Sequence, residues 1–177
     1  MMLKELLEGL SFQCLIGDME IEISDLKTDS RNVESGDLFI AQKGVTTDGH
    51  AYLDQAADRG AAAALVERPL TVGEGSGFRC VVLVDALSKK LAFLGSRFYQ
   101  EPSKSLSVIG ITGTNGKTSV AQMLGDALES QGKRVGIFGT IGNRIGEQYF
   151  ETQNTTLEPI ALQKLFRRAV DHDVSHL

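Results

Sequence analysis

Runs of apolar residues separated by turn residues organise the first part of the chain. Polar and apolar positions alternate from Ile21 to Leu26, and a compact apolar run follows at 38–41. Ser35 and Gly36 lie between the two segments. This pattern predicts two short strands joined by a turn.

A helix and two more strands are expected next. Asp48 can cap a helix that continues to Arg59 and stops at Gly60, because aspartate suits the start of a helix and glycine its end. The apolar runs at 63–66 and 80–85 then predict two buried strands.

Helical spacing replaces the strand pattern after these runs. Leu87, Leu91, Leu94 and Phe98 recur at intervals that place them on one face of a helix. Pro102 cannot continue that helix, so we place a domain boundary here. The expected domains are residues 1–101 and residues 102–177.

The chain beyond Pro102 has the pattern of a strand, loop, helix and strand, which begins a parallel sheet. The expected elements are a strand at 107–111, a helix at 117–130, a strand at 134–139, and a helix with Pro159 in its first turn and Leu162, Leu165, Phe166 and Val170 on one face. The predicted fold class is therefore α/β, with a small N-terminal α/β domain followed by the start of a parallel-sheet ATPase domain.

Charge and composition narrow the classes of partner. The net charge is −5 and the densest basic group is Lys164, Arg167 and Arg168, which argues against a nucleic-acid partner. The opening ten residues have too short an apolar run for a signal peptide, and no membrane span is visible, so we expect a cytoplasmic protein.

The cysteines and histidines carry no motif. Cys14 and Cys80 are far apart with apolar neighbours, which favours two buried thiols over a disulfide or a zinc site. His50 follows Asp48 and Gly49 and is expected at the surface or at a helix start. None of the three histidines is assigned a role.

The segment GITGTNGKTS, residues 110–119, has the chemistry of a phosphate-binding loop. Glycines at 110, 113 and 116 let the backbone approach a phosphate, and Gly-Lys-Thr then opens a helix. In this interpretation Lys117 reaches the β- and γ-phosphates of ATP, and the Thr118 hydroxyl coordinates Mg²⁺. The usual spelling G-x-x-x-x-G-K-[ST] would need glycine at 111, where this chain has isoleucine. A plain strand-to-helix turn is the alternative.

The spelling Gly-Thr-Asn-Gly-Lys-Thr resembles the Mur ligase family, ATP-dependent enzymes that add amino acids or peptides to cell-wall precursors. The segment from Leu26 to Glu67 is similar to the uridine-nucleotide-binding domain of two branches of that family, and GTIGNR followed by Asn154-Thr155-Thr156 is similar to the branch that adds the third, diamino residue. Leu157 stands where the family usually has proline.

This resemblance implies a set of binding residues. The loop residues implied for ATP are Gly113, Thr114, Asn115, Gly116, Lys117, Thr118 and Ser119, with Lys117 catalytic and Thr118 also at the metal. The residues implied for the substrate are Thr28, Ser30, Val45, Thr46 and Thr47 at the UDP moiety, and Asn154, Thr155 and Thr156 at the muramoyl-peptide end. Taken alone, residues 29–31 equally suit a turn, and residues 154–156 a helix cap.

The implied reaction joins UDP-N-acetylmuramoyl-dipeptide to a diamino acid through an acyl phosphate. Alternatives are the branch that adds the D-alanyl-D-alanine dipeptide and a non-catalytic nucleotide- or UDP-sugar-binding module. A family segment with a Mg²⁺-binding glutamate, and the amino-acid-binding domain, have no counterpart among the 177 residues. We therefore expect this chain to be inactive alone, with exposed apolar sheet edges that lead to self-association or to disorder beyond about residue 140.

Overall fold

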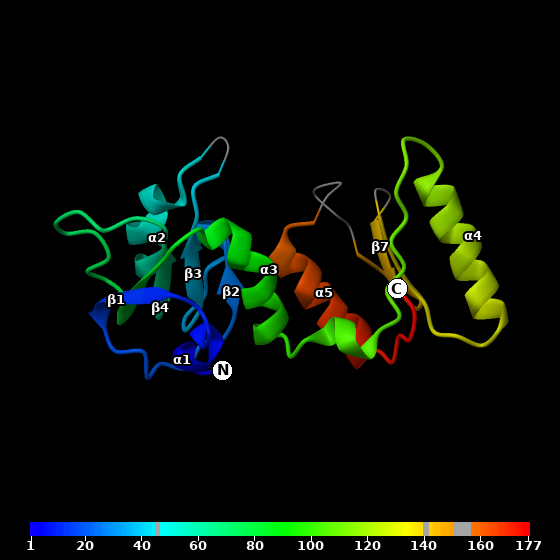
Figure 1. The fold of residues 1–177 in the computed structure, drawn as a ribbon, viewed down its shortest axis with the longest axis horizontal. Coiled ribbons are helices and arrows are strands. Elements are labelled where there is room, and N and C mark those ends of the chain that lie inside the picture. Colours follow the sequence, from blue (N-terminus) through cyan, green and yellow to red (C-terminus); the bar gives the residue numbers. More distant parts are fainter. Residues whose placement is uncertain (45–46, 140–141, 151–156) are drawn as a thin grey trace. The chain divides into compact units, whose positions relative to one another are not determined.

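A computed structural model describes residues 1–44, 47–139, 142–150 and 157–177. The chain forms two compact units, Met1–Leu94 and Gly95–Leu177 (Figure 1). The fold is of mixed α/β class, as predicted.

The first unit is built on a five-stranded sheet with strand order β1-β5-β4-β3-β2. Its strands and helices are α1 (Leu3–Leu7), β1 (Phe12–Gly17), β2 (Leu26–Lys27), the 3-10 turn η1 (Ser30–Asn32), β3 (Leu38–Ala41), the 3-10 turn η2 (Gly49–Tyr52), α2 (Leu53–Asp58), β4 (Ala63–Val66), β5 (Cys80–Val84) and the first part of α3 (Leu87–Phe98). Strands β2 to β5 are parallel, and β1 is antiparallel to β5.

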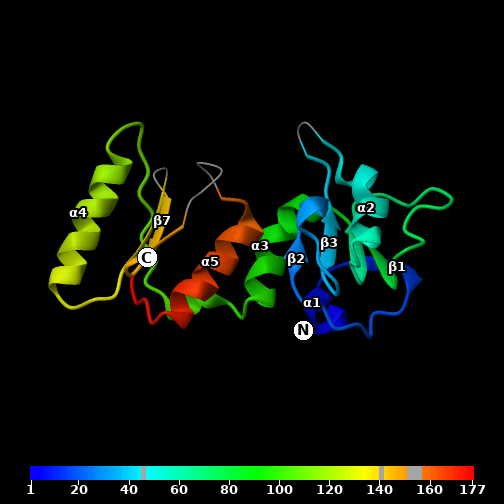
Figure 2. The same cartoon turned by 180° about the vertical axis from the view of Figure 1, so that it is seen from behind.

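Both faces of this sheet are covered. Every residue of β3 and β4 is buried, as expected for parallel strands between two layers. On one face Phe39 and Val66 pack with Leu53 of α2. Figures 1 and 2 place α2 and the first part of α3 on opposite sides of the sheet. The continuous apolar runs in the sequence therefore correspond to strands with no solvent-facing side.

Three sequence predictions for this unit need correction. The strand expected at 21–26 is reduced to β2, because the backbone at Ile21 and Ile23 pairs with the chain's first residues. The helix from Asp48 begins as the 3-10 turn η2 before α2. Cys14 is exposed because it lies on the edge strand β1, so only Cys80 is a buried thiol.

The second unit combines parallel and antiparallel pairing. It contains the rest of α3, the 3-10 turn η3 (Pro102–Ser105), α4 (Lys117–Ser130), β6 (Gly136–Gly139), β7 (Gly142–Ile145), β8 (Gln148–Phe150) and α5 (Pro159–Asp171). Strands β6, β7 and β8 form an antiparallel sheet. Helix α5 packs on it through Phe166, whose ring stacks on Phe138 with 6.1 Å between centroids.

The strand expected at 107–111 is present only as a short extended segment. Ser107 and Val135 each form a parallel bridge with His176. Ile109 N also donates to Leu177 O at 2.7 Å. Residues 175–177 thus lie between the segment that enters the glycine-rich loop 110–116 and the segment that enters β6.

Disorder beyond about residue 140, one of the two alternatives expected, is not found in residues 142–150 and 157–177. Strands β7 and β8 and the thirteen-residue helix α5 are formed there. Phe166 and Ala169 of α5 are buried, because its apolar face has the sheet to pack against. No helix among the described residues has the length and apolar character needed to cross a membrane.

Candidate functional site

The segment 110–119 leads from a short extended segment into α4, and two of its glycines have positive φ. Gly116 is the residue before the helix and has φ +80°, and Gly113 has φ +152°. A Cβ at Gly110 or Gly116 would meet no atom within 4 Å. Because the backbone here is unobstructed, a ligand the size of a phosphate can reach it.

Helix α4 directs its unpaired amide groups toward this loop. The first turn of any helix has N–H groups without an intrahelical acceptor, and its dipole adds positive potential. Here that turn contains Lys117, Thr118 and Ser119. The arrangement suits the negative oxygens of a phosphate chain.

The Lys117 ammonium lies over the loop itself. Its Nζ donates to Gly113 O at 2.6 Å and is 3.5 Å from Thr114 O. These carbonyls are neutral acceptors on an exposed loop, so a phosphate oxygen would be a stronger partner for the same ammonium. Lys117 is therefore held next to the place where a phosphate chain would lie.

A cavity of about 420 Å³ opens beside Lys117 and Thr118. It runs between α4 and the adjoining strands, and its walls include Val108, Ile111 and Ile137. The space is available because α4 is loosely packed, with Gly125 its buried residue. An apolar cavity next to a polar loop is a common form of ligand site.

The loop can supply one protein oxygen to a magnesium ion. The Thr118 hydroxyl is half-buried at the loop's end and can supply one oxygen. No cluster of three or more His, Cys, Asp or Glu side chains suited to a metal occurs in the ranges that the structure describes. Mg²⁺ is typically bound through few protein oxygens plus substrate phosphates, so the ion would arrive with the nucleotide.

The expected UDP residues of the first unit gather at the carboxyl ends of parallel strands. Thr28 and Ser30 follow β2, and Thr47 lies in the connection that follows β3. Ligands of open α/β sheets bind at this edge. Thr47 is exposed and Thr28 half-buried, whereas Ser30 is buried and its hydroxyl donates to Gln55 Oε1 at 2.5 Å.

Residues 29–31 do form the turn that the sequence also allowed. Asp29 caps η1 by accepting from Arg31 N at 3.0 Å, and its Oδ2 lies 2.7 Å from Arg31 Nη2. The side-chain hydrogen bonds from Arg31 hold the pKa of Asp29 below its ordinary value. The turn therefore carries an ionised carboxylate beside the candidate site.

Five expected substrate residues lie outside the described residues. They are Val45, Thr46, Asn154, Thr155 and Thr156. The remaining ones divide between the two units: Thr28, Ser30 and Thr47 belong to the first, and the loop from Gly113 to Ser119 to the second.

Two polar residues of the first unit were missed by sequence reasoning. Gln55 accepts the Ser30 proton, and Glu67, at the end of β4, accepts from two backbone amides. Asp48 as a cap was visible in the sequence, but nothing in the spacing of Gln55 or Glu67 signals their partners. His50 lies in the first turn of η2, which is one of the two positions expected, and it is buried.

Both units match known protein families. Residues 22–97 match the model of the Mur ligase family catalytic domain, and residues 111–177 match the Mur ligase middle domain. UDP-N-acetylmuramoyl-L-alanyl-D-glutamate–2,6-diaminopimelate ligase of Bacillus licheniformis is 42% identical over 158 residues, which are 89% of this chain and 31% of the relative. Ligase 1 of that name from Clostridium acetobutylicum is 40% identical over 173 residues, 98% of this chain and 35% of the relative.

Solved structures agree with the fold. A diaminopimelate ligase structure superposes with a TM-score of 0.78 at 24% identity, covering 99% of this chain and 34% of its own. The MurF ligase of Thermotoga maritima, solved in complex with ADP, has a TM-score of 0.54 at 28% identity and covers 81% of this chain and 28% of its own. The chain spans about a third of the length of the curated relatives it matches. With matching models over both units, the chain belongs to the Mur ligase family, of which it carries the first and middle domain regions.

Proposed function

We propose that this chain is part of an ATP-dependent ligase of peptidoglycan precursor synthesis. The reaction would join a diamino acid to the D-glutamate carboxylate of UDP-N-acetylmuramoyl-L-alanyl-D-glutamate. The observation that carries the proposal is the open glycine loop at the start of α4, with the Lys117 ammonium held over it. Its occurrence in a chain about 40% identical to diaminopimelate ligases supports the choice of substrate.

ATP would supply a phosphoryl group that activates the carboxylate as an acyl phosphate, with ADP leaving. The incoming amine would then attack the acyl carbon, forming the amide and releasing phosphate. Mg²⁺ would neutralise charge on the phosphates. The chain's own contribution is positional. The first-turn amides of α4 bind phosphate oxygens, Lys117 offsets developing negative charge, and Thr118 offers one oxygen to the ion.

The first unit would hold the UDP part of the substrate at the carboxyl edge of β2 and β3. Thr28 and Thr47 offer hydroxyls there, and Ser30 offers its oxygen lone pairs, since its proton is directed at Gln55. Residues Val45, Thr46 and 154–156 are proposed for the substrate on the resemblance alone. The reaction consumes ATP, which favours the cytoplasm as its compartment.

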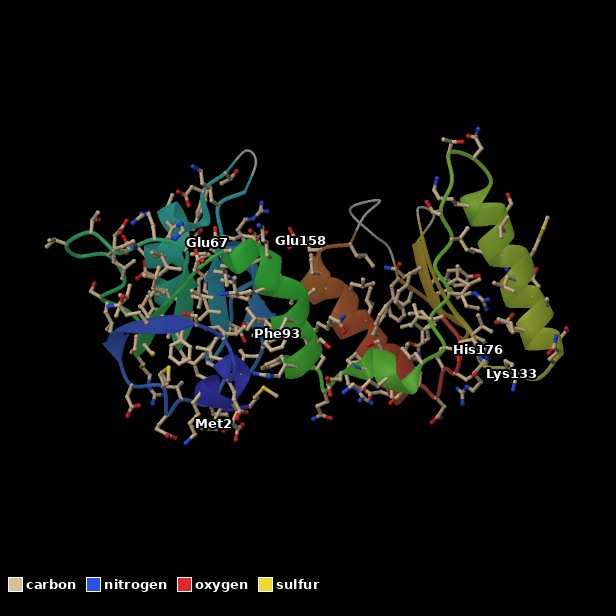
Figure 3. All side chains as sticks on the ribbon, viewed as in Figure 1. Met2, Glu67, Phe93, Lys133, Glu158 and His176 are labelled. Carbon is tan, nitrogen blue, oxygen red and sulfur yellow. The ribbon has the colours of Figure 1, made fainter. Side chains whose placement is uncertain are left out.

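Binding calorimetry with the purified chain tests both sites. Lys117→Ala is expected to weaken ATP·Mg²⁺ binding about 10- to 100-fold, because a hydrogen bond to a charged group contributes about 1.5–3 kcal/mol. Lys133→Ala is the matched control, since Lys133 is an exposed lysine just beyond α4 (Figure 3). Both variants should bind the UDP-linked dipeptide as the parent does.

Two results would count against the proposal. Equal ATP affinity of the parent and of Lys117→Ala would remove the assigned role of the loop. Tighter binding of the UDP-linked tripeptide than of the dipeptide would instead favour the ligase that adds D-alanyl-D-alanine.

A further inference from the structure

The chain after β3 returns on itself at the carboxyl edge of the first unit's sheet. Lys43 and Asp48 form an antiparallel bridge, and Gly49 N donates to Gln42 O at 2.9 Å. Gly44 N also donates to Thr47 O at 2.9 Å. These contacts define a hairpin with an outgoing arm, 42–44, and a returning arm, 47–49. The returning arm includes Thr47, which is proposed to bind the UDP moiety.

A buried imidazole ties the returning arm to the end of β4. His50 is 4% exposed, and its Nε2 accepts from Glu67 N at 3.1 Å. Since Nε2 is an acceptor, the proton of the neutral ring is on Nδ1, which lies 2.6 Å from Asp48 Oδ1. Asp48 Oδ1 also accepts from His50 N at 3.0 Å. The ring therefore links Asp48 directly to the strand end.

The Glu67 carboxylate ties the outgoing arm to the same place. Its Oε2 accepts from Lys43 N at 2.9 Å, and its Oε1 accepts from Ser88 N, at the start of α3, at 3.0 Å. Figure 3 shows Glu67 at the end of the sheet from which the hairpin rises. One residue thus serves both arms, through its carboxylate on one side and through its amide and His50 on the other.

Each ring nitrogen of His50 has one partner, which satisfies its burial. The positions of the two partners carry the argument. Asp48 lies on the returning arm and Glu67 directly follows β4, so the ring fixes the arm to the sheet edge where α/β proteins bind ligands. A loop that is already ordered loses less conformational entropy when a ligand binds, so holding its two arms raises affinity.

We propose that His50 and Glu67 are positioning residues, which clamp the arms 42–44 and 47–49 and so fix Thr47 for a uridine diphosphate group. The inference rests on the proposed function, because it requires that this edge binds the UDP moiety. It adds two residues that do not touch the ligand themselves.

Glu67→Gln is the sharpest perturbation. The amide keeps the size of the side chain and one acceptor oxygen, but it turns an NH₂ group toward one of the two backbone N–H donors. Glu22→Gln is the matched control, an exposed carboxylate before β2. His50→Ala tests the other half of the clamp. Each variant is first checked by circular dichroism to be folded at the titration temperature.

The measurement is calorimetric titration with UDP and, separately, with ATP·Mg²⁺. We expect Glu67→Gln and His50→Ala to weaken UDP binding about tenfold, with ATP binding unchanged and Glu22→Gln equal to the parent. Hydrogen exchange distinguishes positioning from general destabilisation. Amides of 42–44 and 47–49 should exchange faster in the free Glu67→Gln variant, and saturating UDP should restore their protection.

The failures are separable. If the parent binds neither UDP nor the UDP-linked dipeptide, the proposed function of the first unit is refuted, and the positioning role of His50 and Glu67 is refuted as well. If the parent binds UDP and Glu67→Gln binds equally well, the positioning role alone is overturned. Should His50→Ala fail to fold, the Glu67→Gln titration decides the question.

Discussion

Gly17 ends β1 at a point where the neighbouring backbone leaves no room for a side chain. Its φ is +74°, and a Cβ built on it would lie 1.8 Å from Arg79 O and 2.8 Å from Arg79 C. Gly9 has a nearly identical φ of +76°, but a Cβ there would meet nothing within 4 Å. The two glycines therefore share a backbone conformation and differ in the space around them.

The difference sets the expected cost of alanine at each position. A left-handed backbone costs an L-residue about 1–2 kcal/mol, and both variants bear this cost. Ordinary contact begins near 3.4 Å, so Arg79 O would also have to retreat from the Gly17→Ala methyl by about 1.6 Å, the difference between 3.4 and 1.8 Å. Displacing packed backbone adds about 1–3 kcal/mol. We expect about 1 kcal/mol for Gly9→Ala and about 3 kcal/mol or more for Gly17→Ala.

Urea unfolding followed by circular dichroism measures the two free energies. A local probe is also available, since Cys80 is paired with Gly17 across the two strands and is fully buried. The exposed Cys14 reacts in every variant, so the measured quantity is the number of thiols that an aromatic disulfide reagent modifies under native conditions. If β1 moves away from β5, that number should be two in Gly17→Ala, which adds Cys80, and one in Gly9→Ala. Equal unfolding free energies for the two variants, with Cys80 protected in both, would refute the packing argument.

Three further predictions follow from burial and space. Burial, with a smaller contribution from Cys14, raises the pKa of Cys80 from 9.0 to about 12. Below pH 9 the Cys80 thiol is protonated in both the folded and the unfolded chain. Between pH 9 and 12 the unfolded chain loses this proton first, so the free energy of unfolding should fall by up to about 1.4 kcal/mol per pH unit. Cys80→Ala should remove this part of the pH dependence. Leu65→Ala, in the middle of the sheet, should cost about 2–5 kcal/mol in urea unfolding, and a cost below 1 kcal/mol would contradict the described core. Gly125→Ala places a Cβ 2.7 Å from the movable Cδ1 of Ile137, so strain and the gain in helix propensity should nearly cancel, leaving the melting temperature within a few degrees of the parent.

The strands and helices that were predicted correctly from the sequence are those determined by residues close together in the chain. The runs at 38–41 and 63–66 are buried on both sides, and they match β3 and β4. The helix predicted at 117–130 matches α4, because Gly116 precedes its first residue and residues with high helix propensity follow. These signals depend on residues a few positions apart, which a sequence displays directly.

The elements that sequence missed depend on distant partners. Strand β1 has exposed Gln13 and Cys14 on an edge and is formed by pairing with β5, far along the chain. Strand β7 contains Gly142, Asn143 and Arg144, a composition that disfavours strands, and it is stabilised by its two neighbours. Pairing of this kind is a tertiary property, so local propensity does not predict it.

The two candidate sites also differ in whether they depend on residues close together in the sequence or on distant ones. The loop spacing from Gly110 to Thr118 predicts a phosphate site at the start of α4, and the structure has an open glycine-rich loop at that place. The hairpin clamp was not predictable, because His50 and Glu67 meet only after the end of β4 is placed beside η2. A buried histidine with two committed nitrogens has no signature in the sequence.

The short extended segment that leads into the glycine-rich loop has its backbone partner at residues 175–177, of which His176 also bridges to Val135. The first unit's parallel strands β3, β4 and β5 follow one another closely, so they can assemble as soon as they are synthesised. The loop's strand, in contrast, remains without that partner until α4, the β6–β8 sheet and α5 have all been made. Contacts of such long sequence separation form slowly because a large loop must be closed first. During synthesis, the glycine-rich loop would therefore be among the last features of its unit to acquire a fixed position, and a nucleotide bound there as proposed could not stabilise an early folding intermediate.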